Sequence, residues 1–319
     1  MYTAGCGCSG PSSETHEGCA LILSRLGTVT LMRLGAVVLS HEPGQAIVET
    51  LAAISRSQLA IDDVLVVDNN SSRESLQPML TAAPAVEIKR LATNDGYGSA
   101  MNDGAAELIA RGCDTLLFLT QETILQPDAA GYLYRQLKSQ RDIGIVGPIL
   151  CRRSNPSEVW SAGGGFAGLR RIARHLESGQ SLASVDRVTR QVRWLDGACL
   201  MLPAAAFGAV DGFRSDLFLY WEDVDICLRL QRIGRSATCV GAAIAFQEPS
   251  RTPPYLGARN RVLVRGAPGT LGVLLDLLIY AIADPLRGRG LRRVVLEGRG
   301  LRDGVRHRLD RALALERPA

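Results

Sequence analysis

From residue 33 onward, short apolar runs alternate with segments in which apolar residues recur every three or four positions. The run Leu34–Ser40 has the pattern of a buried strand, and the apolar positions within 47–54 are spaced as on one face of a helix. This alternation is typical of βαβ units around a mostly parallel sheet. The other elements predicted in this half are strands at Val64–Asp68, Val86–Leu91, Thr115–Leu119 and Ile143–Leu150, and a helix at Gly98–Ala110.

The second half of the chain has a less regular pattern. The segment Gly163–Arg190 shows no clear periodicity, so we expect a loop-rich insertion there. Regular structure is predicted again at Val192–Leu202, Glu222–Ile233, Ala237–Phe246, Tyr255–Arg265 and Gly269–Ala283. The pattern therefore predicts one α/β domain over residues 32–265, followed by a helical, Arg-rich tail over residues 266–319.

Composition changes this picture at the N-terminus. Residues 1–31 contain a Gly/Ser-rich head with three of the eight cysteines, and Arg25 interrupts the apolar stretch that follows. The segment is a weak candidate for a signal peptide, and we expect a disordered extension instead. The chain has neither a CxxC pair nor a Cys/His set with zinc spacing, which favours a reducing, cytoplasmic location.

The charge is concentrated at the other end. A net charge of +4 is too small to indicate nucleic-acid binding, but residues 285–319 contain ten arginines against four acids. This tail either makes peripheral contact with anionic lipid headgroups or a lipid-linked acceptor, or is an ordinary solvated surface. No stretch reaches the roughly 18–20 uninterrupted apolar residues that span a bilayer.

Polar residues follow three of the predicted strands. Asp68 and Asn70 come after a buried run, where they can accept hydrogen bonds from a nucleotide or simply form a turn. Glu122 lies beyond the strand that ends at Leu119, where it can bind Mg²⁺ or Mn²⁺ bridging a diphosphate, or remain a solvated loop residue. Ser40 ends the first strand and either lines a nucleotide pocket or is an ordinary polar strand end.

Two further segments have compositions that indicate a site. Asn94–Asn102 opens a helix, and its glycines allow close approach of a ligand while the free N–H groups favour an anion. It is not a dinucleotide fingerprint, because the third glycine would fall at Met101. Phe218–Arg229 places three acids in four residues at a helix start, which suits the helix dipole. Its aromatic lead-in also creates a partly desolvated setting for a general base.

Taken together, these segments resemble glycosyltransferase family 2, in particular its rhamnosyltransferase-like members. The resemblance extends from about Leu34 to the arginines near residue 293. The motifs that carry it are VVDNxS at Val66–Ser71, NxGxxxxxN at Asn94–Asn102, GP at Gly147–Pro148, WxxGA at Trp194–Ala198, GF at Gly212–Phe213, FxYxEDVDxxxR at Phe218–Arg229 and YxxxRNR at Tyr255–Arg261.

The resemblance implies a fold of the GT-A type, a Rossmann-like and mostly parallel sheet flanked by helices, with the helical tail behind it. It also implies inverting transfer of a sugar from a nucleotide-diphosphate donor, dTDP-rhamnose or a similar one, to a hydroxyl of a glycan, a lipid-linked or a small-molecule acceptor. A sugar-phosphate nucleotidyltransferase is disfavoured, because no Arg/Lys-containing glycine loop follows the first strand.

The resemblance also implies roles for single residues. Asp223 is expected to be the general base, with Glu222 as the alternative, and Glu122 is expected to bind Mg²⁺ or Mn²⁺. The residues expected to bind nucleotide or substrate are Ser40, Asp68, Asn70, Asn94, Gly96, Asn102, Asp196 and Arg229. For Arg229, a helical surface arginine is the competing interpretation.

Two departures from the family pattern concern the metal. Gln121-Glu122 stands where the family commonly has an aspartate, and Gln247 stands where many relatives have a histidine. They support a rival hypothesis, a homologue that binds sugar nucleotide without turnover. The three retained acids of the Glu222–Asp225 segment favour an active enzyme.

Overall fold

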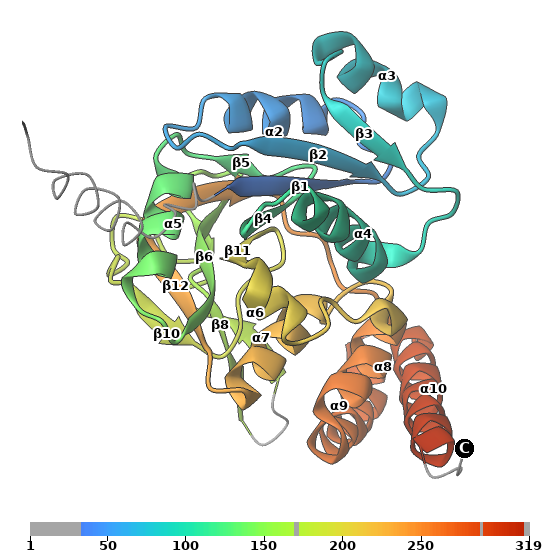
Figure 1. The fold of residues 1–319 in the computed structure, drawn as a ribbon. Coiled ribbons are helices and arrows are strands. Elements are labelled where there is room, and N and C mark those ends of the chain that lie inside the picture. The colour runs from blue at the N-terminus through green and yellow to red at the C-terminus, as the bar shows by residue number, and fades with distance from the viewer. Residues whose placement is uncertain (1–32, 169–171, 288–289, 316–319) are drawn as a thin grey trace, which may run out of the picture. The chain divides into compact units, whose positions relative to one another are not determined.

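The computed structural model describes residues 33–168, 172–287 and 290–315, with side chains as far as Asp310. The extension predicted for residues 1–31 lies outside the described residues. From Arg33 onward the chain forms one compact unit built on a ten-stranded sheet (Figure 1). Its main path has the order β10-β12-β6-β11-β4-β1-β2-β3, while β5 pairs with β12 and β7 with β6.

The strands are β1 (Leu34–Ser40), β2 (Asp63–Asp68), β3 (Glu87–Arg90), β4 (Thr115–Thr120), β5 (Ile124–Leu125), β6 (Ile143–Arg152), β7 (Val159–Ser161), β8 (Gly164–Ala167), β9 (Ile172–His175), β10 (Arg190–Val192), β11 (Cys199–Pro203) and β12 (Ser236–Gln247). The helices are α2 (Ala46–Ser55), α3 (Arg73–Ala82), α4 (Gly96–Ala110), α5 (Ala129–Ser139), α6 (Ala204–Gly208), α7 (Glu222–Arg232), α8 (Pro254–Arg265), α9 (Ala267–Leu286) and α10 (Arg292–Leu315), with a 3-10 turn η1 (Ser215–Leu217).

Parallel pairing dominates one half of the sheet. β1 pairs in parallel with β2 and β4, and β2 with β3, which confirms the predicted α/β fold. Parallel strands end at the same edge, so Ser40 of β1 lies opposite Asp68 of β2. β11 is antiparallel to β4 and to β6 and separates these two strands.

Helices cover both faces of the sheet. The apolar sides of α2, α3 and α5 pack on one face, and those of α4, α6 and α7 pack on the other (Figure 1). Central positions such as Phe118 are fully buried, and burying a side chain of this size contributes about 1.5–3 kcal/mol to folding. Two cores therefore hold the sheet rigid, so that the loops at its carboxyl edge have a fixed base.

The structure corrects two predictions for the second half. Gly163–Arg190 is not only loop, because β8 and β9 form an antiparallel hairpin within it. The segment Val192–Leu202 is not continuous: β10 ends at Val192 and β11 begins at Cys199. Between them the Ala198 N–H donates to the Asp196 carboxylate (2.9 Å). This local hydrogen bond forms a turn in place of strand-to-strand backbone hydrogen bonds.

The tail consists of α9 and α10, which pack with α8. α9 is longer than the predicted Gly269–Ala283. Among the described residues it is the one helix whose length and apolar composition would allow it to cross a membrane. Its inner face includes buried Val273 and Asp276. Its other face carries exposed apolar side chains at helical spacing, namely Leu271, Leu274, Leu278, Ile279, Ile282 and Leu286. We call these six residues the apolar stripe.

Candidate active site

The carboxyl ends of β1, β2 and β4 form a connected polar network. The His41 N–H donates to the Gln121 carboxamide (2.6 Å), which donates back to the His41 carbonyl (3.0 Å). Asn69 donates to the Asn94 side chain (2.8 Å), and Asn94 lies 3.2 Å from the His41 ring. The Ser40 hydroxyl is buried here and has no hydrogen-bond partner among the described residues. The structure thus brings Ser40 and Asn94 together at one edge of the sheet.

Asp68 lies in the same network and is fully buried. Its carboxylate accepts hydrogen bonds from the Ser71 hydroxyl and backbone N–H, and Arg90 lies 3.4 Å away. Asn70, two residues on, is exposed and has a positive φ of 63°. Asp68 therefore stabilises the turn after β2, which agrees with the interpretation that this segment forms a turn.

The start of α4 is filled by protein rather than open to a ligand. A Cβ on Gly96 would lie 2.1 Å from the Phe218 carbonyl oxygen, and the Tyr97 N–H donates to that oxygen (2.7 Å). Gly96 has a φ of 86°, which other residues rarely adopt. We predicted that these glycines allow close approach of a ligand. In the structure they instead allow close approach of the loop before α7.

That loop has an unusual backbone. Phe218, Tyr220 and Trp221 have φ values of 66°, 71° and 77°, and such conformations in non-glycine residues cost about 1–3 kcal/mol each. Asn260 of α8 is fully buried and donates to the carbonyls of Leu217, Leu219 and Tyr220 at 3.0, 2.9 and 2.9 Å. The C-terminal part of the chain thus fixes the loop that leads into the acid-rich start of α7.

Asp223 is oriented by backbone on the wall of a cleft of about 1320 Å³. Its carboxylate accepts from the Gly197 N–H (2.9 Å), and the Tyr97 hydroxyl donates to the Gly197 carbonyl (2.8 Å). Burial, and then the nearby Asp196 charge, raise the pKa of Asp223 to about 7. The side chain nevertheless keeps part of its surface exposed, so it can meet a substrate.

Glu222 is the more deeply buried acid. It is 3% exposed, its Oε1 has no hydrogen-bond partner among the residues that the structure describes, and burial raises its pKa to about 8. It lines the same cleft, but its burial makes it the harder of the two to reach. Asp223 therefore suits a base that contacts substrate better than Glu222 does.

A second acidic group lies at the strand-end side of the cleft. Asp196 accepts from the Trp160 indole N–H (3.0 Å) and from the Gln247 carboxamide (3.3 Å). Glu122 accepts from the Thr120 hydroxyl (3.0 Å), and burial, with a further effect of the Asp196 charge, raises the pKa of Glu122. The charges of these two carboxylates repel each other, and a nearby cation would relieve this repulsion.

These side chains fit a divalent cation that is shared with a substrate. Mg²⁺ is commonly held by one or two carboxylates plus substrate phosphates, and Glu122 and Asp196 supply two carboxylates. Within the described ranges 33–168, 172–287 and 290–310, no three His, Cys, Asp or Glu side chains converge as a metal group. The remaining ligands would therefore come from a diphosphate or from water.

Aromatic side chains close the cleft beside Asp196. The His175 ring lies between Trp160 and Trp194, at centroid distances of 4.3 and 4.8 Å. Its Nδ1 is 3.8 Å from Asp196, and burial lowers the pKa of His175. Flat, partly buried rings of this kind commonly line sugar-binding clefts because they cover the apolar face of a ligand.

Two residues predicted to bind substrate are instead engaged with protein. Asn102 exchanges two hydrogen bonds of 2.8 Å with the Phe213 backbone. Arg229 pairs with Asp225 (2.6 Å) and donates to the carbonyls of Val210 and Gly212. Neither residue lines the cleft. Arg229 is partly buried rather than a surface arginine, and both residues hold neighbouring backbone in place.

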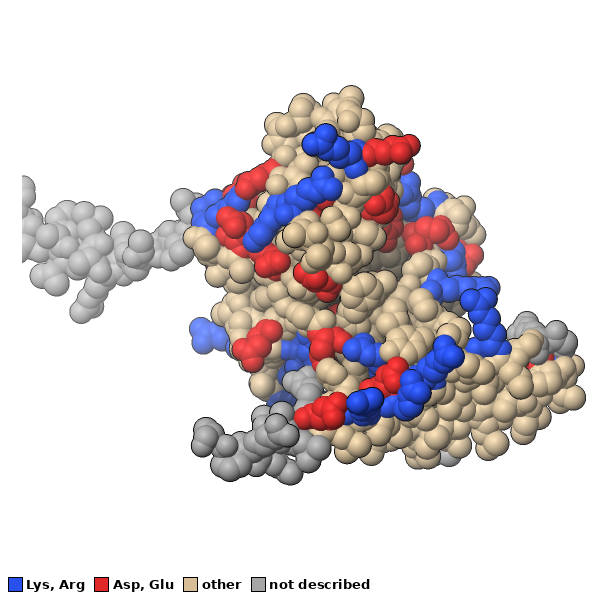
Figure 2. All heavy atoms as spheres, turned by 90° about the vertical axis from the view of Figure 1, so that its right-hand side faces the viewer, with Lys and Arg blue, Asp and Glu red and all other residues tan. Residues whose placement is uncertain are grey.

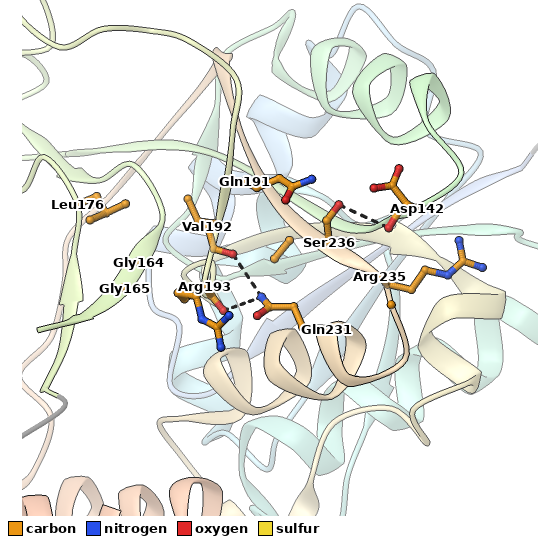
Figure 3. Close-up of a pocket in the computed structure, with 12 residues that line it drawn as sticks. Asp142, Gly164, Gly165, Leu176, Gln191, Val192, Arg193, Gln231, Arg235 and Ser236 are labelled. Atoms are coloured by element: carbon orange, nitrogen blue, oxygen red, sulfur yellow. Dashed lines mark hydrogen bonds between the residues drawn. The ribbon is translucent and has the colours of Figure 1, made fainter. Parts of the chain in front are cut away.

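A smaller hollow of about 510 Å³ lies away from these acids (Figure 3). Gln231 crosses it and donates to the carbonyls of Val192 (3.3 Å) and Arg193 (2.9 Å). Figure 3 also shows the Ser236 hydroxyl bonded to the Asp142 carbonyl. None of the predicted site residues lines this hollow, which leaves the larger cleft as the candidate site.

Several site residues were missed in the sequence. His175 is one of four histidines that are widely spaced in the sequence, and Trp160 precedes the segment that was expected to be a loop. Asn260 belongs to the RNR motif, for which the resemblance implies no role of its own. A polar residue in an otherwise apolar helix face, as Asn260 is in α8, is the one signal that could have indicated it.

The fold is a mostly parallel sheet with a polar network at its strand ends and a cleft lined by several carboxylates. Residues 33–269 match the family described as "Glycosyltransferase like family 2", which is more than half of the chain. The chain belongs to this family and is a glycosyltransferase. The resemblance inferred from the motifs is thereby confirmed.

Individual relatives agree with this assignment. The N-acetylglucosaminyl-diphospho-decaprenol L-rhamnosyltransferase of Mycobacterium tuberculosis is 26% identical over 229 residues, which cover 66% of this chain and 74% of the relative. The same values hold for the proteins of strains CDC 1551 / Oshkosh and H37Rv. Together with the family match, they make the chain rhamnosyltransferase-like.

Solved structures show the same fold at low identity. GalNAc-T7, crystallised with UDP, GalNAc and Mn²⁺, superimposes with a TM-score of 0.62 at 13% identity, over 86% of this chain and 54% of that chain. This chain thus spans about half the length of that protein. A mannosyltransferase from Pyrobaculum calidifontis, in complex with GDP-Man and Mn²⁺, gives 0.50 at 14% identity, over 90% and 81%.

Proposed function

We propose that the chain is an inverting transferase that moves a rhamnosyl-type sugar from a nucleotide-diphosphate donor to a hydroxyl of a lipid-linked acceptor, with Asp223 as the general base. The carrying observation is the Asp223 carboxylate, which is held by the Gly197 N–H on the wall of the cleft and has a pKa of about 7. A base with a pKa near the working pH is about half ionised at neutrality and accepts a proton readily. The name of the M. tuberculosis relative supports the sugar and the class of acceptor.

In the proposed reaction, Asp223 accepts the proton of the acceptor hydroxyl as that oxygen forms a bond to the anomeric carbon. The bond from this carbon to the donor's diphosphate oxygen breaks on the opposite side, and its electron pair leaves with the nucleoside diphosphate. A divalent cation held by Glu122 and Asp196 would supply positive charge for that leaving group. Gly197, fixed by Tyr97, keeps the carboxylate oriented throughout.

The donor's nucleotide is proposed to bind at the carboxyl ends of β1 and β2. The support is the unpartnered Ser40 hydroxyl beside Asp68, at the edge where ligands of parallel sheets commonly bind. Gln121 connects this network to Glu122, the next residue in the chain. The nucleoside would then bind at the ends of β1 and β2, and its diphosphate would bind next to it near Glu122.

A calorimetric donor screen tests this proposal. UDP-, GDP- and dTDP-sugars are each titrated with Mn²⁺, with Mg²⁺ and with EDTA, and transfer to a diphosphate-linked acceptor is assayed in parallel. We expect one nucleotide class to bind tightly and to lose affinity in EDTA. Asp223→Asn should keep donor binding and lose about 10²–10⁴-fold in turnover. Binding without turnover in the wild type would favour the inactive homologue, and near-normal turnover of Asp223→Asn would remove it as the base.

We also propose that the tail contacts a membrane from one side. The apolar stripe of α9 is exposed, and Figure 2 shows a broad surface with few charges at the level of the helical tail, with arginines along its edge. α9 does not suit spanning, because it packs along α10, which carries many arginines that hydrocarbon would not accept. An interfacial helix binds through its apolar face and nearby cations.

Flotation with vesicles containing phosphatidylglycerol tests this contact. The double variant Leu278→Ser and Ile282→Ser removes two residues of the stripe that are 62% and 59% exposed, and should lower vesicle binding by roughly tenfold or more. The matched control is Leu80→Ser with Ile109→Ser, at two exposed positions on other helices. Equal loss in both double variants, or none in either, would contradict contact through α9.

A further inference from the structure

The cleft continues from the acids into an arm between α8, α9 and α10. The charged and aromatic side chains of these helices that line it are Arg261, Asp276, Tyr280, Arg293 and Glu297. The three helices lie below the sheet in Figure 1. The arm therefore extends the site beyond the residues used in the proposed reaction.

Arg261 is the exceptional residue of this arm. It is only 6% exposed, yet just one of its nitrogens has a recorded partner, the Asp276 carboxylate at 2.6 Å. Its Nε and Nη2 are buried with no hydrogen-bond partner among the described residues. A buried charged donor without a partner is unfavourable in a folded protein, and such groups commonly have a ligand or function that explains them.

We propose that this arm binds the diphosphate of the lipid-linked acceptor, with Arg261 as its anion-binding residue. The inference rests on the proposed function, because it presupposes an acceptor of that class. The planar guanidinium presents adjacent N–H groups that match two phosphate oxygens at once. A free Nε and Nη2 are such an adjacent pair, whereas Nη1 is already held by Asp276.

The other charges of the arm define how selective it is. Arg293 pairs with Glu297 at 2.8 Å and stacks on Tyr280 at 3.6 Å. With Asp276 paired to Arg261, the arm holds two cations and two carboxylates, so its overall charge does not favour every anion. An anion is held here by directed donors, which favours a diphosphate whose oxygens reach Arg261.

The position of α9 explains why the acceptor, rather than the donor, occupies this arm. Asp276 lies on the inner face of α9, and the apolar stripe lies on the outer face of the same helix. A polyprenyl chain attached to a diphosphate in the arm can therefore continue along an apolar surface. The donor's diphosphate is instead accounted for near Glu122, at the strand-end side of the cleft.

The test compares two acceptors that carry the same sugar. One is N-acetylglucosamine linked through a diphosphate to a short prenyl chain, and the other is its octyl glycoside, which has no phosphate. Arg261→Gln should raise KM for the diphosphate acceptor by about 10- to 100-fold, the loss expected for charge-assisted hydrogen bonds. KM for the donor and the rate with the octyl glycoside should stay unchanged. Arg302→Gln removes the same charge at an exposed place on α10 and should change neither.

The outcomes separate the possible failures. If the wild type transfers sugar to neither acceptor, the proposed function fails before Arg261 is tested. If Arg261→Gln slows both acceptors equally and lowers the melting temperature, Arg261 is structural and the inference is overturned. If the donor KM rises instead, the arm binds the donor's diphosphate and the inference is again overturned. Arg261→Lys keeps the positive charge but lacks the adjacent N–H groups of the guanidinium. An intermediate KM for the diphosphate acceptor supports the proposal.

Discussion

Asn260 provides a direct test of how the catalytic loop is held. Its carboxamide is fully buried and donates to three carbonyls of the loop that contains Phe218, Tyr220 and Trp221 in positive-φ conformations. In Asn260→Ala the Leu219 and Tyr220 carbonyls lose this donor while the backbone strain remains; the Leu217 carbonyl keeps the Leu219 N–H (2.9 Å) and Arg259 (3.3 Å). The side chain has two N–H groups, so the variant removes two shared donors rather than three independent ones.

The expected cost follows from those contacts. A buried group left without its hydrogen-bond partner costs about 1–3 kcal/mol, so we expect Asn260→Ala to lower the free energy of unfolding by about 2–4 kcal/mol. The loop leads directly into Glu222 and Asp223, and a shift of a reacting group by about 1 Å can cost 10²-fold in rate. Turnover should therefore fall by about 100-fold, while donor affinity stays near that of the wild type.

Urea denaturation and steady-state kinetics measure the two effects separately. Asn102→Ala is the matched control. The Asn102 side chain also makes two partly buried hydrogen bonds to backbone, both to Phe213, but it does not line the cleft. It should lose a similar amount of stability and keep its turnover number. The reasoning is refuted if Asn260→Ala is destabilised as expected but turns over normally, or if both variants lose turnover equally.

The acids lead to two pH-dependent predictions. Because Asp223 has a pKa of about 7 and acts as a base, kcat/KM should fall tenfold per pH unit below that pKa and level off above it; a flat profile between pH 5.5 and 8.5 would exclude it. Glu222 has its pKa raised from 4.5 to about 8 in the folded chain, so its contribution to stability is present below pH 4.5 and is lost as the pH rises through 8. Glu222→Gln should therefore be more stable than the wild type at pH 9 by roughly 3–5 kcal/mol and nearly equal to it at pH 5; urea midpoints that differ equally at both pH values would contradict this.

The sheet was largely predictable because its strands are continuous apolar runs. β1 has the predicted bounds, and β2, β4, β6 and β12 differ from them by only one or two residues, since buried parallel strands leave a strong hydropathy signal. β8, β9 and β10 were not predictable in this way. They are three or four residues long, partly exposed and rich in glycine and arginine, so pairing rather than composition determines them.

For the site, the sequence indicated which residues matter more reliably than what each of them does. The acids Glu122, Glu222 and Asp223 all line the cleft, as the ends of strands and the start of a helix led us to expect. Gly96 was singled out correctly as a special position, but its neighbour is the Phe218 backbone and not a ligand. Local sequence cannot reveal contacts between segments more than a hundred residues apart, and those contacts decide such roles.

The position of β11 affects how the enzyme folds. Cys199 of β11 pairs with Leu119 of β4, and Met201 pairs with Val146 of β6, so the sheet cannot close in its middle until a strand made much later in the chain enters it. Pairings so distant in sequence are slow to form because a long loop must be ordered first. The turn at Asp196 and Gly197 immediately precedes β11 and reaches its place with that strand. We therefore expect Asp196 to join the other acids of the cleft only when β11 has entered the sheet.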